Sequence, residues 1–147
     1  AGNIEGNIGR SPANRKKMAV VARGGKPAAT RYRVERVFGP PGNALASIVE
    51  CTLLTGRTHQ VRVHMASRGH ALVGDPVYGR ARRKSKGWED AIALLNAFDR
   101  QALHAFRLGF THPRSGKKML FESDLPEDLK ELISALEVCV GHVADSP

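Results

Sequence analysis

The stretch TRYRVERVFGPPGNALASIVECTLL, residues 30–54, decides the fold. Apolar and charged side chains alternate over its first nine residues, with Tyr32 and Phe38 expected on the same side. A period of two is typical of a strand with one buried face. PPGN (40–43) predicts a turn, and residues 44–54 are rich in β-forming side chains. The sequence therefore predicts an antiparallel pair of strands.

Strands and helices follow in mixed order on both sides of this pair. They lack the regular alternation of strand and helix that is typical of a parallel sheet, which indicates the α+β class, a mixed or antiparallel sheet with flanking helices. The other expected elements are a glycine-rich loop before Met18, a strand at 16–22, helices at 59–68, at 88–99 and from about Pro126, a second strand pair at 102–113 and 117–123, and a basic loop at 80–87.

The segment TGRTHQVRVHM (55–65) predicts the start of a helix. Thr58 is a suitable cap for a helix beginning at His59, with Val61, Met65 and Ala66 on its apolar face and Gly69 as its end. The alternation of Val61 with Val63 also permits a strand.

The charge is unevenly distributed along the chain. Residues 1–86 contain 17 Lys/Arg against 4 Asp/Glu, whereas residues 87–147 contain 6 against 10. A basic half in an otherwise balanced protein indicates a polyanionic partner, and nucleic acid is the first candidate. No apolar run is long enough for a membrane span, and Cys51 and Cys139 are expected as buried thiols, which suits the cytoplasm.

Two histidines lie in the same basic segment. His59 and His64 are separated by five positions with no glutamate between them, unlike the i,i+4 pair of a helical zinc site, so no metal is expected. A histidine beside arginines more often donates hydrogen bonds to phosphate or to backbone than it acts as a general base, and both roles remain open.

Arg62 lies between Val61 and Val63, where an unpaired guanidinium is costly to bury. It therefore requires a carboxylate or a phosphate, and an ion pair with an acid of this chain is as compatible with the composition as an external partner. Asp75, between Gly74 and Pro76, is expected to hydrogen-bond its own backbone in a turn.

Residues 53–79, LLTGRTHQVRVHMASRGHALVGDPVYG, resemble the long signature of the RluA-type pseudouridine synthases. Within that family the chain is most similar to the RluD-like subgroup that modifies 23S ribosomal RNA. The further segments that resemble the family, in its order, are IGRSPANRKKMAV, GKPAATRYRVE, FDRQALHAFRLGFTHPRSGKKM and LPEDLKELI.

The resemblance implies an enzyme that isomerises uridine to pseudouridine in RNA without a cofactor. The family's catalytic aspartate lies in an upstream HRLD motif, followed by a K-x-Y segment, and neither string occurs here. Residues 1–137 are therefore expected to form the C-terminal half of a catalytic domain, with 138–147 as a tail, and to be inactive alone. The alternatives are a non-catalytic RNA-binding module and a synthase that acts on transfer RNA.

The resemblance also assigns site residues. Arg62 would pair with the catalytic aspartate, so that in this chain it would face solvent or a bound anion. Were Arg62 buried in a complete ion pair with an acid of this chain, such as Glu50 or Asp75, that catalytic assignment would fail. The residues expected to contact RNA are Arg10, Arg15, Lys16, Lys17, Arg57 and His59.

Overall fold

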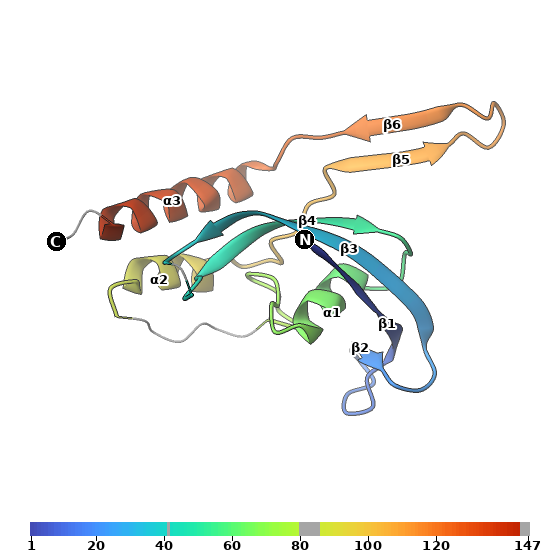
Figure 1. Cartoon of the computed structure of the whole chain (residues 1–147), viewed down its shortest axis with the longest axis horizontal. Coiled ribbons are helices and arrows are strands. Elements are labelled where there is room, and N and C mark those ends of the chain that lie inside the picture. The colour runs from blue at the N-terminus through green and yellow to red at the C-terminus, as the bar shows by residue number, and fades with distance from the viewer. Residues whose placement is uncertain (41, 80–85, 145–147) are drawn as a thin grey trace.

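The computed structural model describes residues 1–40, 42–79 and 86–144, and it confirms the α+β class. Residues 80–85 of the expected basic loop lie outside the described residues. Within the described part of the chain no helix is long and apolar enough to cross a membrane. The elements, in chain order, are β1 (Gly2–Arg10), β2 (Met18–Val21), β3 (Lys26–Phe38), β4 (Ala46–Leu53), α1 (Gln60–Ser67), α2 (Glu89–Ala97), β5 (Arg107–Thr111), β6 (Lys118–Glu122) and α3 (Glu127–Ala144) (Figure 1).

The main sheet has the order β2-β1-β3-β4, and all its neighbouring strands are antiparallel. The expected pairing of residues 30–38 with 44–54 is confirmed as β3 and β4. Val34 pairs with Val49 and Arg36 with Ile48, so β3 contains one extra residue. Such a bulge reverses the alternation of side chains. The expectation that Phe38 shares a face with Tyr32 is therefore wrong.

The expected glycine-rich loop before Met18 is also wrong, because residues 2–10 form β1 inside the sheet. Ile4 and Ile8 provide its buried side chains, and its glycines allow the neighbouring segments to approach closely. A Cβ on Gly6 would lie 2.8 Å from a methyl of Val20. Glycine is enriched here because a side chain would collide with the next strand, and this is the same composition that indicated a loop.

Two clusters of buried side chains hold the layers together. In the first, Val63 of α1 packs on Ile8 and Ala28 of the sheet, with Met18 and Tyr78 at its border. The second lies where α2 and α3 meet the β3–β4 turn, and its buried members are Phe38, Leu45, Ala91, Ile92, Leu95 and Leu136. The first cluster fixes α1 on the sheet and thereby positions the segment that carries Arg62.

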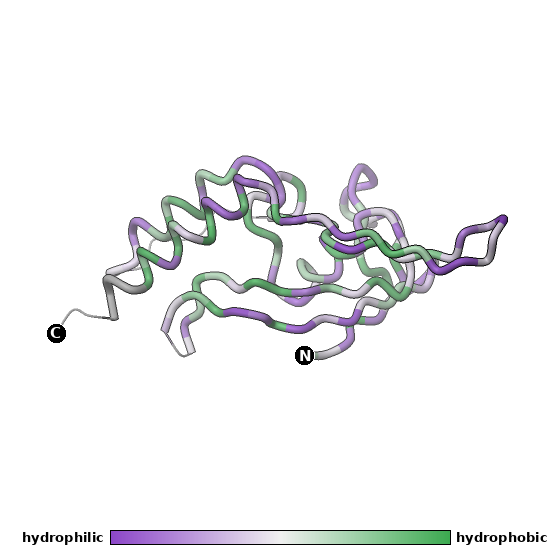
Figure 2. Tube along the Cα trace, turned by 90° about the horizontal axis from the view of Figure 1, so that it is seen from above, coloured by the Kyte–Doolittle hydropathy of each residue, from purple (hydrophilic) through white to green (hydrophobic). Residues whose placement is uncertain are grey.

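Helix α3 begins with acidic side chains, as expected for the positive end of a helix dipole. Hydrophobic and hydrophilic residues alternate along its turns (Figure 2). The helix continues without interruption to Ala144, whereas a tail was expected from residue 138.

The hairpin of β5 and β6 extends away from the rest of the chain (Figure 1). The pairs Leu108–Phe121 and Phe110–Met119 lie on one face, where the rings of Phe110 and Phe121 stack 5.9 Å apart. Leu108 is 61 % exposed and Phe121 50 % exposed. This face is apolar and has little of the chain against it, and a two-stranded hairpin without a packed face is marginally stable.

We therefore expect the amide hydrogens of β5 and β6 to exchange at least about 10-fold faster than those of β1 and β3, because local opening of the hairpin exposes few buried contacts. Native-state hydrogen exchange followed by NMR measures this difference. Equal protection in the two sheets would contradict it.

Candidate functional site

The Gln60 side chain ties the start of α1 to the sheet. Its Oε1 accepts hydrogen bonds from the Thr55 hydroxyl at 2.7 Å and the Arg57 N–H at 2.9 Å. Its Nε2 donates to the Ala29 carbonyl and the Thr30 hydroxyl, both at 3.0 Å. The side chain is buried with its bonding capacity used in full, so the loop before α1 and strand β3 are fixed relative to each other.

The helix begins one residue later than expected. His59, not Thr58, is the residue before the first turn, and its φ of 57° places it in the left-handed region without a side-chain cap. Among the described residues, His59 is the only one other than glycine that has a positive φ. Such a conformation costs of order 1 kcal/mol or more, and it persists only where the surrounding contacts fix it. The expected apolar face is confirmed in part: Met65 is buried, but Val61 and Ala66 are only half-buried, and Val63 is buried instead.

Arg62 forms a complete ion pair with Asp75. Its Nε donates to Oδ2 and its Nη2 to Oδ1, both at 2.8 Å, and the side chains are 11 % and 0 % exposed. Asp75 Oδ1 also accepts the backbone N–H groups of Val77 and Tyr78, which confirms its expected turn role. The same carboxylate therefore closes the turn and neutralises the guanidinium.

This pair corrects the expectation for Arg62, which does not await an external anion at its Nε–Nη2 edge. The carboxylate that its burial requires comes from Asp75, so burial gives no argument for a catalytic partner. For its Nη1 no hydrogen-bond partner is found among the described residues. The guanidinium carbon lies 5.0 Å from the centre of the Tyr78 ring, at a distance typical of a cation–π contact.

The environment of Asp75 favours its ionised form. Burial alone raises the pKa of this carboxyl, but the hydrogen bond from Arg62, the two backbone N–H groups and the positive charge of Arg62 together outweigh burial. The pKa falls from 3.8 to about 2. The pair is therefore charged throughout the physiological range of pH.

Tyr78 joins three segments of the site. Its hydroxyl accepts the Met18 N–H at 3.1 Å and lies 3.0 Å from His59 Nδ1. One residue away, the Val77 carbonyl accepts a hydrogen bond from Lys17 Nζ at 2.7 Å. Residues 75–79, hereafter the 75–79 loop, thus bring Lys17 and His59 together beside Arg62.

The other residues expected to contact RNA lie around this centre without joining it. Arg57 is half-buried and donates from Nε to the Pro27 carbonyl at 2.9 Å. Arg10, Arg15 and Lys16 are exposed in and beside the β1–β2 turn. Gln60 and Tyr78 were not predicted from the sequence, although both lie in the stretch that resembles the family signature.

His64 lies in the interior, away from His59. It is fully buried, its Nδ1 is 2.9 Å from the Thr30 hydroxyl, and its Nε2 has no hydrogen-bond partner among the described residues. Burial, and secondarily the charge of Arg68, lower the pKa of His64. Within the described ranges no group of three or more His, Cys, Asp or Glu side chains is placed to hold a metal ion.

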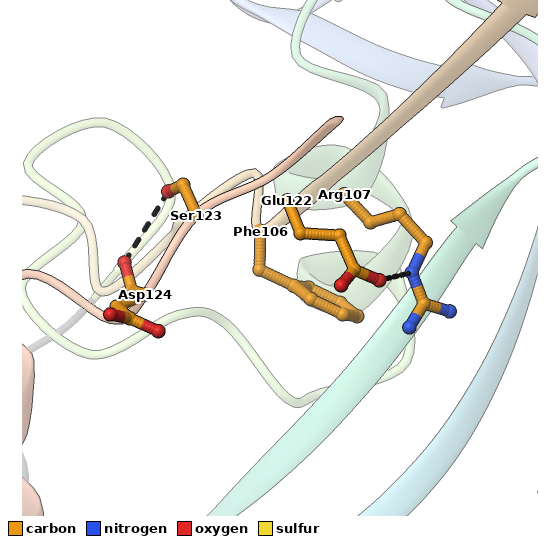
Figure 3. A pocket seen from close by; sticks show the side chains of 5 residues that line it. All are labelled: Phe106, Arg107, Glu122, Ser123 and Asp124. Atoms are coloured by element: carbon orange, nitrogen blue, oxygen red, sulfur yellow. Dashed lines mark hydrogen bonds and ion pairs between the residues drawn. The ribbon is translucent and has the colours of Figure 1, made fainter. Parts of the chain in front are cut away.

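A hollow of the described surface lies elsewhere, at the base of the β5–β6 hairpin. It has a volume of about 440 Å³, and an ion pair of 2.8 Å between Arg107 and Glu122 lies on its wall (Figure 3). Phe106, Ser123 and Asp124 complete the lining. None of the site residues expected from the sequence belongs to it.

We expect Asp75→Asn to lower the free energy of unfolding by about 3 kcal/mol or more, because it leaves the Arg62 guanidinium buried without a counter-charge. Asp128→Asn is the matched control. Asp128 binds Arg100 with the same atoms, at 2.6 and 2.8 Å, but the two side chains are 43 % and 37 % exposed, so its loss should cost at most about 1 kcal/mol. Urea unfolding measures both, and equal losses would contradict the role of burial.

The pKa of Asp75 also predicts how the stability difference between the wild type and Asp75→Asn depends on pH. Because the pKa is lower in the folded than in the unfolded protein, the ionised carboxylate contributes about 2 kcal/mol. That contribution is fully present above the unfolded pKa of 3.8 and is lost as the pH falls through about 2. The stability gap between wild type and Asp75→Asn should therefore narrow by this amount between about pH 5 and pH 2. A gap that stays constant would mean that the Asp75 pKa is not depressed.

Residues 1–67 match the family model described as RNA pseudouridylate synthase. The ribosomal large subunit pseudouridine synthase D of Neisseria meningitidis is 50 % identical over 142 residues, which are 95 % of this chain and 36 % of that protein. The protein of the same name from Zymomonas mobilis is 50 % identical over 138 residues, 93 % of this chain and 41 % of its own length. In the Escherichia coli protein the identity is 46 % over 136 residues. The chain thus spans about two fifths of the length of these relatives.

A solved structure, that of human RNA pseudouridylate synthase domain containing 1, has a similar fold. It superposes with a TM-score of 0.64 at 26 % identity, over 99 % of this chain and 60 % of the human one. The resemblance read from residues 53–79 and the further segments is confirmed. By its sequence and by its fold, the chain is similar to RNA pseudouridylate synthases.

Proposed function

We propose that this chain is part of the catalytic domain of a synthase that isomerises uridine to pseudouridine in large-subunit ribosomal RNA. The observation that carries the proposal is the 50 % identity, over 95 % of the chain, to a ribosomal large subunit pseudouridine synthase D. At this level of identity a shared substrate class is a reasonable expectation. The activity belongs to the longer proteins, of which the chain spans 36–41 %.

In this proposal the nucleophile comes from outside the chain. The HRLD and K-x-Y motifs, which carry the catalytic residues in the family that the chain resembles, do not occur in the 147 residues. Asp75 is an unsuitable substitute, because its carboxylate is fully buried and its oxygens accept hydrogen bonds from Arg62, Val77 and Tyr78. The chain would then provide the surface on which an aspartate from the rest of the domain acts.

The pair with Asp75 limits what Arg62 can do in such an enzyme. Its Nε and Nη2 hydrogen bonds are already committed, so a second carboxylate would have to approach from the Nη1 side. A guanidinium can bind one carboxylate side-on and another end-on. Because the ion pair with Asp75 is complete and buried, we assign Arg62 to holding the 75–79 loop on α1 and not to the partnership with a catalytic aspartate.

The apolar face of the β5–β6 hairpin supports the proposal that the chain is one part of a larger domain. Leu108, Phe110 and Phe121 lie on one face of the strand pair and are 45–61 % exposed, so this face is an exposed apolar patch. The portion of the relatives that this chain does not span is the occupant proposed for this face. The same unspanned portion would also carry the catalytic residues. The exposed apolar face and the missing HRLD and K-x-Y strings therefore have one explanation.

The basic residues near the site support RNA as the partner. Lys17 and His59 meet at the 75–79 loop, and Arg10, Arg15 and Lys16 are exposed nearby along the chain. An enzyme that acts on a base inside folded RNA must unstack it, and contacts from cations to the phosphate backbone offset that cost. The basic face alone also suits the second candidate, a non-catalytic RNA-binding module.

Binding of the chain to transcribed 23S RNA should weaken with salt, with a log–log slope of roughly −0.7 per phosphate neutralised on single strands. Charge reversal at Arg15, Lys16 and Lys17 should weaken binding of all RNA sequences alike. Reversal at Arg114, Lys117 and Lys118 in the β5–β6 hairpin is the matched control, with the same change in net charge. Filter binding or anisotropy measures both, and equal losses would assign the effect to net charge instead of the β1–β2 turn.

Activity separates the two candidates. The chain alone should form no pseudouridine in transcribed 23S RNA, because the nucleophile is missing. Produced together with the part of the Neisseria relative that lies outside the matched residues, it should form pseudouridine if the two associate. Leu108→Thr with Phe121→Thr should prevent this association, and Val138→Thr, which replaces another exposed apolar residue, should not. Chemical mapping of pseudouridine is the readout. Conversion by the chain alone would refute the external nucleophile, and association without conversion would favour the binding module.

A further inference from the structure

Tyr78 lies where the start of β2, the start of α1 and the 75–79 loop meet. Its hydroxyl contacts the Met18 N–H at 3.1 Å and His59 Nδ1 at 3.0 Å. Its ring meets the His59 ring edge-on, with centres 5.7 Å apart and planes at 79°. The same ring also contacts the Arg62 guanidinium, whose carbon lies 5.0 Å from the ring centre. One side chain thus contacts both a histidine and an arginine of the candidate site.

The hydrogen atoms of these contacts can be assigned from their chemistry. The Met18 backbone N–H can only donate, so it occupies one acceptor position on the Tyr78 oxygen. The phenol has one hydrogen, and among the described residues the acceptor within reach of it is His59 Nδ1. If Nδ1 carried a hydrogen instead, the half-buried hydroxyl would accept twice and leave its own hydrogen without a protein partner. The favoured arrangement therefore has Tyr78 donating to an unprotonated Nδ1.

We propose that Tyr78 is a positioning residue that holds His59 in the tautomer with its hydrogen on Nε2, so that His59 presents an outward hydrogen-bond donor to a phosphate oxygen of RNA. The RNA part of this inference rests on the proposed function, whereas the tautomer does not. The contact with Tyr78 also explains the left-handed backbone of His59, because this conformation lets the exposed His59 ring reach the Tyr78 hydroxyl.

The surroundings of His59 suit a phosphate. Lys17 is held against the neighbouring Val77 carbonyl, and Arg57 is two positions before His59 in the chain. Asp75, the acid of this region, is fully buried and already neutralised by Arg62. The Nε2–H of this tautomer can donate a hydrogen bond to an anion, and its direction is fixed by the bond at the other ring nitrogen.

The test is Tyr78→Phe in the full 147-residue chain, because phenylalanine keeps the ring against Arg62 and removes only the hydroxyl. Long-range ¹H–¹⁵N NMR spectra of the histidine rings at neutral pH report which nitrogen carries the hydrogen. We expect Nε2–H at His59 in the wild type and a mixture of tautomers in Tyr78→Phe. Tyr32→Phe, at the other tyrosine of the chain, is the control and should leave His59 unchanged.

A hydrogen on Nδ1 in the wild type, or an unaltered tautomer in a folded Tyr78→Phe, would overturn the proposal. Affinity for transcribed 23S RNA tests its second half. Tyr78→Phe should weaken binding by about 2- to 10-fold, the effect of one hydrogen bond, and should have no further effect in a His59→Ala background. A tautomer change with unaltered affinity would overturn the role of His59 as a donor to RNA. If the wild-type chain did not bind transcribed 23S RNA, the proposed function would be refuted. The NMR spectra would still decide the tautomer of His59.

Discussion

The burial of one guanidinium is the constraint on which the site depends. Arg62 of α1 faces the 75–79 loop, and Asp75 supplies the counter-charge at 2.8 Å from a fully buried position. Because the same carboxylate accepts the N–H groups of Val77 and Tyr78, the pair also determines the shape of the 75–79 loop. That loop in turn receives Lys17 at one carbonyl and His59 at the Tyr78 hydroxyl. The basic residues are therefore arranged by a buried acid.

Helix α1 distributes its functions among adjacent residues. Gln60 faces inward, where four hydrogen bonds fix the helix start to β3 and to the preceding loop. Arg62 turns toward the 75–79 loop, and His59 stays exposed just before the first turn. Helix α1 is thus a rigid support for the residues around it, and the proposal places the nucleophile in the remaining length of the relatives.

Much of the fold was predictable because its signals are local. The alternation in β3, the turn before β4 and the acidic first turn of α3 each depend on a few neighbouring residues. The errors occurred where tertiary contacts reverse a local signal. The glycines of β1 indicated a loop, but Gly6 is there because Val20 leaves no room for a Cβ. Phe38 was placed on the wrong face because a bulge cannot be recognised from the alternation alone.

The candidate site was predictable in its charged residues and not in its neutral ones. Arg62 clearly required an anion, and Asp75 clearly formed a turn, yet nothing in the spacing of 13 positions showed that the two meet. Gln60 and Tyr78 have no charge to balance, so their importance arises only from the partners that the fold brings to them.

A double-mutant cycle on Arg62→Met and Asp75→Leu tests the central claim most directly, because it isolates the energy that the two side chains share. Urea unfolding of the wild type, the two single variants and the double variant gives the coupling energy. The account predicts about 2 kcal/mol or more, with the double variant more stable than either single one, as expected for a buried pair. A coupling below about 0.5 kcal/mol, the value typical of independent or exposed sites, would contradict it.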